Sequence, residues 1–369
     1  MSAVGPIMIM AGGTGGHVFP GLAVADALRA RGHGVVWLGT RRGLEARVVP
    51  RHGIDIEWIS VSGLRGKGVK GLVTAPFRAA FAVGQALGVM RRRKPSAVLG
   101  MGGFVSGPGG LAAWLTRRPL VIHEQNAIAG TANRWLARFA TRVFEAFPSS
   151  FPRGIEAERI GNPVRREIAA LPPAAPRVAE LREARSAARR ARLLVLGGSQ
   201  GARVLNLTVP QALAALPETL RPEVRHQAGR LHEEARAAYR DAGVDADVVE
   251  FIDDIAGAYG WADFAVARAG ALTISELAAA GLGAVLVPYP HAIDDHQMKN
   301  AESFASGGAA IVIAERELTP ARLATELEAL LEQPARLEAM AAASRAQARV
   351  DAADRLADAC IALAKEGRR

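Results

Sequence analysis

The sequence has almost no cysteine and no long apolar run. Its 369 residues include a single cysteine, Cys360, which argues against disulfides and a cysteine-based zinc site and favours a reducing cytoplasm. No apolar stretch approaches the roughly 20 residues that a helix needs to span a bilayer, so we do not expect an integral membrane protein. The first ten residues lack the basic start of a signal peptide, and we expect none.

Acidic residues are scarce in the first half of the chain. Residues 1–163 hold 21 lysines and arginines against 8 acidic residues, whereas residues 164–369 hold 25 against 28. The formal charge of +10 therefore comes from the first half. Such an asymmetry indicates an anionic partner for that half, which is a nucleic acid, a membrane surface or a phosphorylated substrate.

Two glycine-rich segments are the most informative feature that is present. Residues 7–11 form an apolar run that leads into Gly12–His17, and residues 193–196 lead in the same way into Gly197–Ala202. A buried strand, a glycine turn and a helix together present backbone N–H groups and a helix N-terminus to an anion. Two such units predict two nucleotide-binding folds in one chain, and half the residues are apolar, enough for two cores.

The order of apolar runs and helical patterns predicts an α/β fold with parallel sheets. The break falls near residues 161–163, which gives an N-terminal domain at 1–163 and a C-terminal domain at 164–344. A helix at about 345–369 is expected to pack back on the first domain, and residues 172–191 are expected to be a poorly packed linker. The expected strands are 6–10, 35–38, 56–59, 97–101, 120–122, 142–144, 193–196, 223–227, 248–251, 264–267, 284–287 and 310–313, and the main helical patterns are 20–30, 127–139, 272–280, 319–331 and 337–365.

A glycine loop alone is weak support for any one ligand. A dinucleotide-binding unit would also need an acidic residue after its second strand to hold a ribose. The residues after 35–38 are Gly39, Thr40, Arg41 and Arg42. A hydride-transfer enzyme also rarely needs a second phosphate loop, so this interpretation is disfavoured.

Several polar groups stand at predicted helix starts in the second half. Gly270 precedes Thr273, Ser275 and Glu276, where hydroxyls and N–H groups would bind a pyrophosphate and Glu276 would take ribose hydroxyls. The alternative is an ordinary capped helix. The pair Asp245 and Asp247 has the Asp-x-Asp form of a metal motif, but a solvated turn is the favoured interpretation.

The segment 72–90 is apolar on more than one helical face, with Phe77 and Phe81 on one stripe. A helix that packs on a sheet needs only one apolar face. The basic residues Arg91, Arg92, Arg93 and Lys94 follow at once, and Trp114 precedes another basic pair. This combination suits an anionic bilayer surface, while burial of the helix on both sides is an equal alternative.

Seven strings together resemble the MurG family of bacterial peptidoglycan glycosyltransferases, which belongs to glycosyltransferase family 28. They are GGTGGHVFPGLAVA from Gly12, GMGGFVSGPGG from Gly100, HEQNAIAG from His123, GNPVR from Gly161, GGSQGARVLN from Gly197, ARAGALTISELAAAG from Ala267 and PYPHAIDDHQMKNA from Pro288. The resemblance covers nearly the whole chain in order. It implies two Rossmann-like domains facing across a cleft, the GT-B architecture. It also implies an inverting, metal-independent and cofactor-free transfer of N-acetylglucosamine from UDP-N-acetylglucosamine to the C4 hydroxyl of the muramyl residue of lipid I, giving lipid II.

The resemblance also implies roles for individual residues. Donor groups in the C-terminal domain are Ser199 at the diphosphate, Ile252 and Arg268 near the uracil, Ala271, Leu272, Thr273, Ile274, Ser275 and Glu276 around the phosphates and ribose, and Gln297 on the sugar hydroxyls. Groups of the N-terminal domain that reach the sugar are Thr14, Gly15, Gly16 and Asn126, with Arg165 at the interdomain junction. The chain departs from the family pattern at His296, where some members have glutamine.

His17 is the candidate general base. A neutral imidazole suits removal of the acceptor proton at pH 7, and the helix dipole at this position disfavours its charged form. The alternatives are that His17 caps the helix or orients the acceptor pyrophosphate, and that Glu124 is the base.

The expected partners are UDP-N-acetylglucosamine, lipid I, an anionic membrane surface and other cell-wall synthesis proteins, without nucleic acid. The expected location is peripheral, on the cytoplasmic face of the inner membrane. Two other functions stay open at this point. One is a UDP-sugar 2-epimerase on the same fold, and the other is a noncatalytic nucleotide-binding scaffold.

Overall fold

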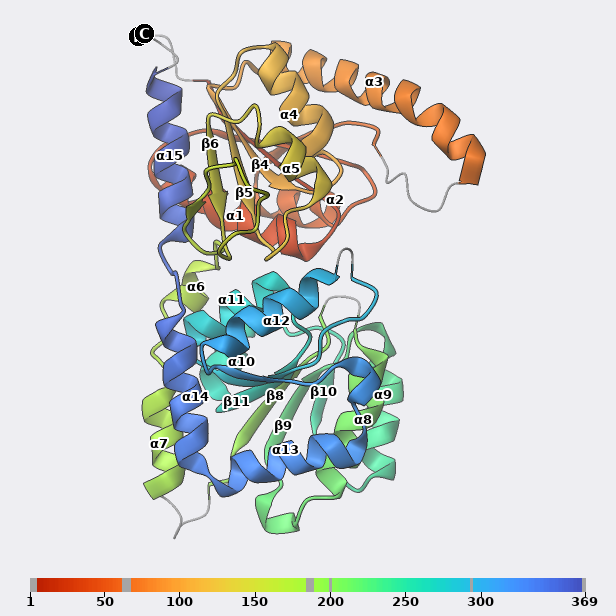
Figure 1. Cartoon of the computed structure of the whole chain (residues 1–369), viewed down its shortest axis with the longest axis vertical. Coiled ribbons are helices and arrows are strands. Elements are labelled where there is room, and N and C mark those ends of the chain that lie inside the picture. The colour runs from red at the N-terminus through yellow and green to blue at the C-terminus, as the bar shows by residue number, and fades with distance from the viewer. Residues whose placement is uncertain (1–4, 62–67, 184–188, 199–200, 293–294, 367–369) are drawn as a thin grey trace. The chain divides into compact units, whose positions relative to one another are not determined.

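The computed structural model describes residues 5–61, 68–183, 189–198, 201–292 and 295–366, with the side chains of 68–73 and 181–183 left out. The chain forms two compact units. Unit 1 comprises Met1–Arg165 and Val350–Arg369, and unit 2 comprises Arg166–Arg349. Figure 1 shows the elements of each unit.

Unit 1 is built on a seven-stranded sheet in the order β3-β2-β1-β4-β5-β6-β7. All the strand pairs are parallel. The strands are β1 (Ile7–Ala11), β2 (Val35–Gly39), β3 (Asp55–Trp58), β4 (Ala97–Gly102), β5 (Leu120–Glu124), β6 (Arg142–Glu145) and β7 (Glu158–Arg159). The central strands β1, β4 and β5 are buried along their whole length, because helices cover both faces of such a sheet.

The helices of unit 1 include one from the end of the chain. They are α1 (Gly15–Ala30), α2 (Glu45–Val48), α3 (Gly68–Arg93), α4 (Ser106–Leu115), α5 (Thr131–Leu136) and α15 (Ala352–Glu366), with the short 3₁₀ helix η1 (Val49–His52). Helix α15 packs on α1, and its residues Leu356 and Cys360 join the same core as Leu28. Arg31 pairs with Asp354 across 2.7 Å at the rim of this contact. Burial raises the pKa of the Cys360 thiol to about 12, so this cysteine is an inert core residue.

Unit 2 has a six-stranded parallel sheet in the order β10-β9-β8-β11-β12-β13. The strands are β8 (Arg192–Leu196), β9 (Glu223–Gln227), β10 (Asp247–Val249), β11 (Phe264–Ala267), β12 (Gly283–Leu286) and β13 (Ala310–Val312). The helices are α6 (Arg166–Ala169), α7 (Ala175–Glu183), α8 (Arg203–Ala214), α9 (His232–Asp241), α10 (Ile255–Trp261), α11 (Ala271–Ala280), α12 (His296–Ser306), α13 (Pro320–Glu332) and α14 (Pro334–Ala346), with 3₁₀ turns η2 (Glu218–Leu220), η3 (Gly229–Leu231) and η5 (Glu315–Glu317).

These two sheets confirm the predicted α/β class with two parallel-sheet units. Every predicted strand is present within two residues of its expected bounds, and the short β7 is added. The helix expected at 127–139 is shorter, because the segment before Thr131 is held as a loop by hydrogen bonds to Glu124. The late helical stretch is also divided, since α14 ends at Ala346 and α15 begins at Ala352.

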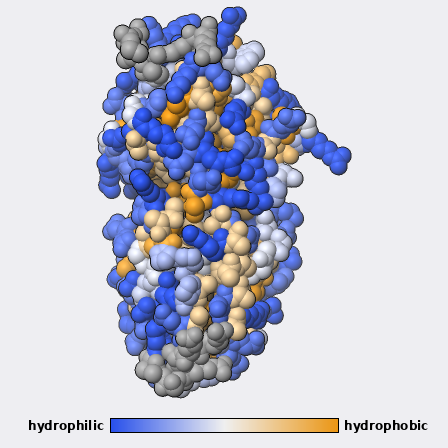
Figure 2. All heavy atoms as spheres, turned by 90° about the vertical axis from the view of Figure 1, so that its left-hand side faces the viewer, coloured by the Kyte–Doolittle hydropathy of each residue, from blue (hydrophilic) through white to orange (hydrophobic). Residues whose placement is uncertain are grey.

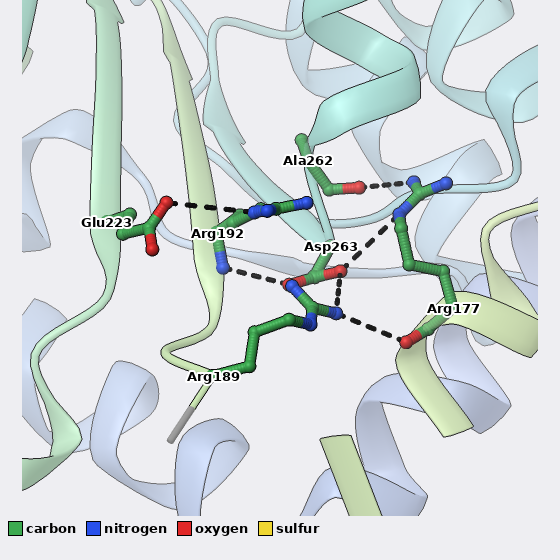
Figure 3. Close-up of polar contacts among 6 residues, drawn as sticks. All are labelled: Arg177, Arg189, Arg192, Glu223, Ala262 and Asp263. Carbon is green, nitrogen blue, oxygen red and sulfur yellow. Dashed lines mark hydrogen bonds and ion pairs between the residues drawn. The ribbon is translucent and has the colours of Figure 1, made fainter. Parts of the chain in front are cut away.

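The interpretation of residues 172–191 as a poorly packed linker is wrong for its described part. Helix α7 lies there, and its Val178 is fully buried. Asp263, buried at the start of β11, accepts hydrogen bonds from Arg189, with Nη1 to Oδ2 at 3.0 Å, and lies 3.5 Å from Arg177 Nε (Figure 3). A buried carboxylate needs such partners, so the arginines attach this segment to the sheet.

In the view of Figure 2 the described surface of each unit is largely hydrophilic, with apolar groups between the charged side chains. No helix in the described part of the chain is both long and apolar enough to cross a membrane.

Candidate active site

Both glycine loops lie at the switch points of their sheets. In unit 1 the strand order reverses between β1 and β4, and in unit 2 it reverses between β8 and β11. Open parallel sheets bind ligands outside the carboxyl ends of the strands at such points. The loops after these four strands hold most of the residues that the sequence nominates.

The first glycine loop, which follows β1, is held by a buried carboxylate. Glu45 is fully buried and accepts hydrogen bonds from Gly13 N at 3.0 Å, Thr40 N at 2.9 Å and Thr40 Oγ1 at 2.8 Å. Gly13 itself has a φ of +92°, a conformation that favours glycine. Glu45 therefore fixes the loop that leads to His17.

Sequence reasoning missed Glu45. An acidic residue does follow β2, but it comes six positions after Gly39 and binds backbone within the protein. The charged residues Arg41 and Arg42 nearby make this segment resemble an exposed turn in the sequence. No periodicity distinguishes a buried loop carboxylate from an exposed one, so a single sequence carries no signal for it.

His17 stands in the first turn of α1 and is half-buried. Its Nδ1 lies 2.8 Å from Gln125 Oε1, in the loop after β5. Gly102, at the end of β4, has a φ of +101°, and a Cβ built there would lie 2.8 Å from His17 Cε1 and 2.9 Å from Nδ1. The ring is therefore enclosed on its Nδ1 side by two neighbouring strand ends.

A second buried histidine continues this contact. Gln125 Nε2 lies 3.0 Å from His123 Nδ1, and His123 Nε2 lies 2.9 Å from the carbonyl oxygen of Gly161. Burial lowers the pKa of His123 to about 4, with a smaller effect from the nearby His17. His123 is thus neutral at pH 7.

Glu124, the alternative base, is buried and fully engaged with its own loop. Its Oε1 accepts from Asn126 N at 3.0 Å and Asn126 Nδ2 at 3.2 Å, and its Oε2 accepts from Gly130 N at 3.1 Å and Asn133 Nδ2 at 2.8 Å. A carboxylate with these four contacts orders the loop that carries Asn126 and Gln125. Its geometry is that of a structural group more than of a base open to substrate.

The other nominated residues of unit 1 occupy the same edge or its border. Thr14 is the N-cap residue of α1, and Gly15 and Gly16 are its first two helical residues. Backbone N–H groups in the first turn of a helix have no partner within that helix, so they are suited to bind an anion or a sugar oxygen. Arg165 lies over the ring of Phe19, with 5.3 Å from its guanidinium carbon to the ring centroid.

The second glycine loop follows β8 in unit 2. Gly198 and Gly201 have φ values of +80° and +77°, which again favour glycine. Ser199, expected at the diphosphate, lies outside the described residues. Helix α8 begins at Arg203, just after this loop.

Helix α11 follows β11 on the other side of the switch point. Its N-cap is Gly270, and Ser275 Oγ donates to the carbonyl oxygen of Ala271 at 2.9 Å. The side chains of Ala271 and Ile274 are buried in the core, so these residues can reach a ligand only through their backbone. The same first turns also contain Leu272 and Thr273, both half-buried.

Glu276 is buried behind these turns, with Oε2 3.1 Å from the hydroxyl of Tyr259. Sequence reasoning missed Tyr259, which lies on α10. A tyrosine amid Ile255–Trp261 looks like an ordinary core residue, and nothing in the sequence pairs it with a carboxylate 17 positions later.

Arg268 and Gln297 build the loop after β12. Arg268 Nη2 lies 2.5 Å from Glu315 Oε2, and Arg268 Nη1 donates to the carbonyl oxygen of Val287 at 3.1 Å. Gln297 Oε1 accepts from Tyr289 N at 3.0 Å. Ile252 lies in the loop after β10 and is half-buried. The ion pair of Arg268 with Glu315 could not be predicted from the sequence, because the two residues lie far apart in the chain.

Asp245 and Asp247 are both exposed, but only Asp245 lies in the loop before β10. Asp247 begins β10, and its carboxylate lies 4.0 Å from Arg225 on the neighbouring strand β9.

Two parallel α/β units, each with a glycine loop at its switch point, define the two-domain GT-B class of glycosyltransferases. The glycosyltransferase family 28 N-terminal domain matches residues 7–145, and the family's C-terminal domain matches residues 192–356. The chain belongs to glycosyltransferase family 28.

The similarity to known proteins covers nearly the whole chain. The UDP-N-acetylglucosamine–N-acetylmuramyl-(pentapeptide) pyrophosphoryl-undecaprenol N-acetylglucosamine transferase of Nitrosococcus oceani is 59% identical over 361 residues, 97% of this chain and 98% of that protein. The protein of the same name from Alkalilimnicola ehrlichii is 55% identical over 98% of this chain and 99% of its own. The crystal structure of Acinetobacter baumannii MurG matches with a TM-score of 0.82 and 39% identity, over 97% of this chain and 99% of that one.

Proposed function

We propose that this glycosyltransferase moves N-acetylglucosamine from UDP-N-acetylglucosamine to the C4 hydroxyl of the muramyl residue of lipid I, an undecaprenyl-pyrophosphate-linked muramyl pentapeptide. The product is lipid II, the precursor of peptidoglycan. The observation that carries this substrate assignment is the 59% identity to a transferase of that name over 97% of the chain.

In this proposal the chain's residues divide the work between donor and acceptor. Unit 2 binds UDP, with the phosphates at the first turns of α11 and the ribose at Glu276. His17 in unit 1 accepts the proton of the acceptor hydroxyl. The hydroxyl oxygen forms a bond to the anomeric carbon as that carbon's bond to the β-phosphate oxygen breaks, and UDP leaves with the electron pair. Attack from the face opposite UDP inverts the configuration.

Helix N-termini supply the positive potential that the departing pyrophosphate needs. Preorganised N–H groups aimed at developing charge are among the strongest contributions to catalysis. No metal or cofactor is part of the proposal, and the exposed Asp245 and Asp247 have no role in it.

We further propose that unit 1 associates peripherally with the cytoplasmic face of the inner membrane. Phe77 and Phe81 on α3 are 77% and 62% exposed, and α3 packs against α4 (Figure 1). Buried residues of α3, such as Ala82 and Ala86, face the core, so the two phenylalanines lie on the outer face. The exposure of these two rings supports the proposal of an outward apolar stripe.

A second aromatic group supports the same proposal. Trp114 at the end of α4 contacts Phe139, with 5.3 Å between ring centroids, and Phe139 contacts Trp135 at 5.1 Å. All three rings are partly exposed. Interfacial aromatic residues with basic neighbours suit an anionic bilayer. Sequence reasoning named Trp114 and missed the other two.

The basic cluster at the C-terminal end of α3, Arg91–Lys94, has a divided role. Glu57 on β3 binds Arg92 at 2.8 Å and Arg93 at 2.7 Å, so these two guanidinium groups hold the helix end to the sheet. Arg91 and Lys94 are exposed. We assign the contact with anionic lipid to this second pair.

Incubation with labelled UDP-N-acetylglucosamine, with and without the lipid-linked muramyl peptide, tests the function. We expect label in the lipid product only when the acceptor is present. Conversion of the nucleotide sugar without acceptor would indicate the 2-epimerase instead. Binding of UDP without turnover in either reaction would indicate a noncatalytic scaffold.

A further inference from the structure

Three polar side chains in unit 1 form an unbroken path from the protein backbone to His17. His123 Nε2 lies 2.9 Å from the carbonyl oxygen of Gly161. Gln125 Nε2 lies 3.0 Å from His123 Nδ1 and 3.1 Å from the carbonyl oxygen of His123. Gln125 Oε1 lies 2.8 Å from His17 Nδ1. His123 and Gln125 are buried, so these contacts are shielded from water.

The direction of each hydrogen bond follows from the two backbone carbonyls, because a carbonyl oxygen can only accept. The carbonyl of Gly161 requires a proton on His123 Nε2. Burial keeps His123 neutral at pH 7, with a pKa of about 4, so its Nδ1 is bare and accepts. The carbonyl of His123 requires the NH₂ group of Gln125 on that side. The amide oxygen of Gln125 must therefore face His17.

An amide oxygen is also only an acceptor, so the contact at 2.8 Å places a proton on His17 Nδ1. In a neutral imidazole the other nitrogen, Nε2, then carries the lone pair. We propose that Gln125, oriented by His123, is a positioning residue that fixes His17 in the tautomer with its proton on Nδ1 and its lone pair on Nε2.

This tautomer matters because, among the described residues, the hydrogen bond of the His17 ring is made at Nδ1, which leaves Nε2 as the nitrogen that can take a proton. Gln125 and Gly102 enclose the Nδ1 side of the ring. A histidine side chain free in water favours the opposite tautomer, which has the proton on Nε2 and no base there. When Nε2 takes the acceptor proton, the imidazolium keeps its Nδ1–H bond to Gln125, and no further proton has to move.

The effect of this tautomer on catalysis rests on the proposed role of His17 as the base. The tautomer itself is a property of the resting protein and can be observed without substrate. An experiment on the tautomer therefore separates a failure of this inference from a failure of the proposed base.

Nitrogen NMR of the full chain labelled with ¹⁵N-histidine provides the test, because protonated and bare ring nitrogens have well-separated resonances. The chain has eight histidines, and the signals of His17 are those lost in His17→Phe. We expect the parent at pH 7.5 to show His17 with Nδ1 protonated and Nε2 bare.

Two substitutions of Gln125 make the test specific. Gln125→Met keeps the length of the side chain but offers no acceptor, so the Nε2–H form of His17 should become the major one. A Gln125→Glu carboxylate can still accept from His17 Nδ1, although it cannot donate to His123 as the amide does. This variant should therefore retain the Nδ1–H form, and it tests the acceptor toward His17 separately from the donor toward His123. The control is Gln85→Met, which removes a glutamine that accepts from Ser60 N elsewhere in unit 1.

Kinetics on the same variants give a second readout. Gln125→Met should lower kcat at least ~10-fold with the donor KM unchanged, as loss of a group that orients a reacting side chain does. Gln125→Glu should lose less of kcat than Gln125→Met, because only the glutamate keeps an acceptor for His17 Nδ1. A parent spectrum with the proton on His17 Nε2, or a Gln125→Met spectrum identical to the parent's, would overturn the inference. If the tautomer shifts as expected while His17→Ala keeps its kcat, the inference holds and the proposed base is wrong.

Discussion

Tyr259 donates its hydroxyl to Glu276 Oε2 across 3.1 Å, and both side chains are buried in unit 2, at 1% and 5% exposed. The tyrosine lies on α10 and the carboxylate on the next helix, α11. A buried carboxylate needs hydrogen-bond donors. Tyr259 is thus a positioning residue for the group that we propose to bind the donor ribose.

Glu276→Ala should weaken UDP binding by ~1.5–3 kcal/mol, because charge-assisted hydrogen bonds to the ribose are lost. Tyr259→Phe should weaken it by only ~0.5–1.5 kcal/mol, since the carboxylate stays but is held less firmly. Calorimetry with UDP measures both. Tyr239→Phe is the matched control, because this buried tyrosine of the same unit binds His226 and should leave UDP affinity unchanged. An unaltered affinity in Glu276→Ala would remove the ribose assignment.

Glu45→Gln should destabilise unit 1 and slow transfer. Glutamine presents one NH₂ group where the buried carboxylate accepts bonds from Gly13 and Thr40, so at least one N–H donor loses its acceptor. We expect a loss of ~1–3 kcal/mol in the free energy of unfolding, measured by chemical denaturation. Glu158→Gln, at an exposed pair with Arg142, should cost under ~1 kcal/mol. Equal stability of the two variants would show that the glycine loop does not depend on Glu45.

Acid should destabilise unit 2 through His226. Burial lowers the pKa of this histidine from 6.5 to about 3, so at intermediate pH the unfolded chain binds a proton that the folded unit does not. The contribution to stability is complete above pH 6.5 and declines as the pH falls from there toward 3. Over the whole interval it amounts to roughly 5 kcal/mol.

Urea midpoints at pH 7 and pH 5 test this expectation. His226→Gln keeps a partner for the Tyr239 hydroxyl but cannot titrate, so its midpoint should fall less between the two pH values than the parent's. His52→Gln alters an exposed histidine of unit 1 and should follow the parent. A parallel fall in all three proteins would mean that His226 does not titrate on unfolding as proposed.

The sequence was sufficient to predict the two parallel sheets and the two glycine loops that follow β1 and β8. Strand periodicity and two glycine turns located β1 and β8, because a buried parallel strand followed by a tight turn leaves a local pattern. The parallel direction of the strands followed from their alternation with helices. His17 was nominated by its place directly after the first of those turns, and Glu276 by its place about one turn into the helix that follows Gly270. Both are likewise local properties of the sequence.

The side-chain contacts that hold the candidate site could not be predicted from the sequence. Glu45, Tyr259 and the pairing of Gln125 with His17 all depend on side chains that are distant in the chain and meet only after folding. Hydrogen-bond networks carry no periodicity, so one sequence cannot reveal them. Asp263 shows the same limit, because its burial gives the arginines of residues 172–191 a structural role that their composition concealed (Figure 3).

Replacement of Phe77 and Phe81 with serine should reduce sedimentation with anionic vesicles, because exposed apolar area that would enter the interface is lost. Activity on a short, water-soluble acceptor should stay close to the parent's. Phe251→Ser is the control, since this phenylalanine is also exposed but lies in unit 2. If the double variant sediments as the parent does, the stripe on α3 is not the membrane contact.

His17→Ala should lower kcat by about 10²–10⁴-fold, the usual effect of removing a general base, with UDP affinity near normal. Glu124→Gln separates the two candidates. Glu124 accepts four hydrogen bonds within its own loop, so its substitution should lower stability together with kcat, whereas His17→Ala should leave the denaturation midpoint close to the parent's. EDTA should leave the parent's rate unchanged at saturating substrates.

The size of the loss in kcat distinguishes the two bases further. Retention of more than about a tenth of the parental kcat in His17→Ala would exclude it as the base and return attention to Glu124. A rate abolished by EDTA and restored by Mg²⁺ would contradict the metal-free mechanism and reopen the case for Asp245 and Asp247, which lie exposed just before and at the start of β10.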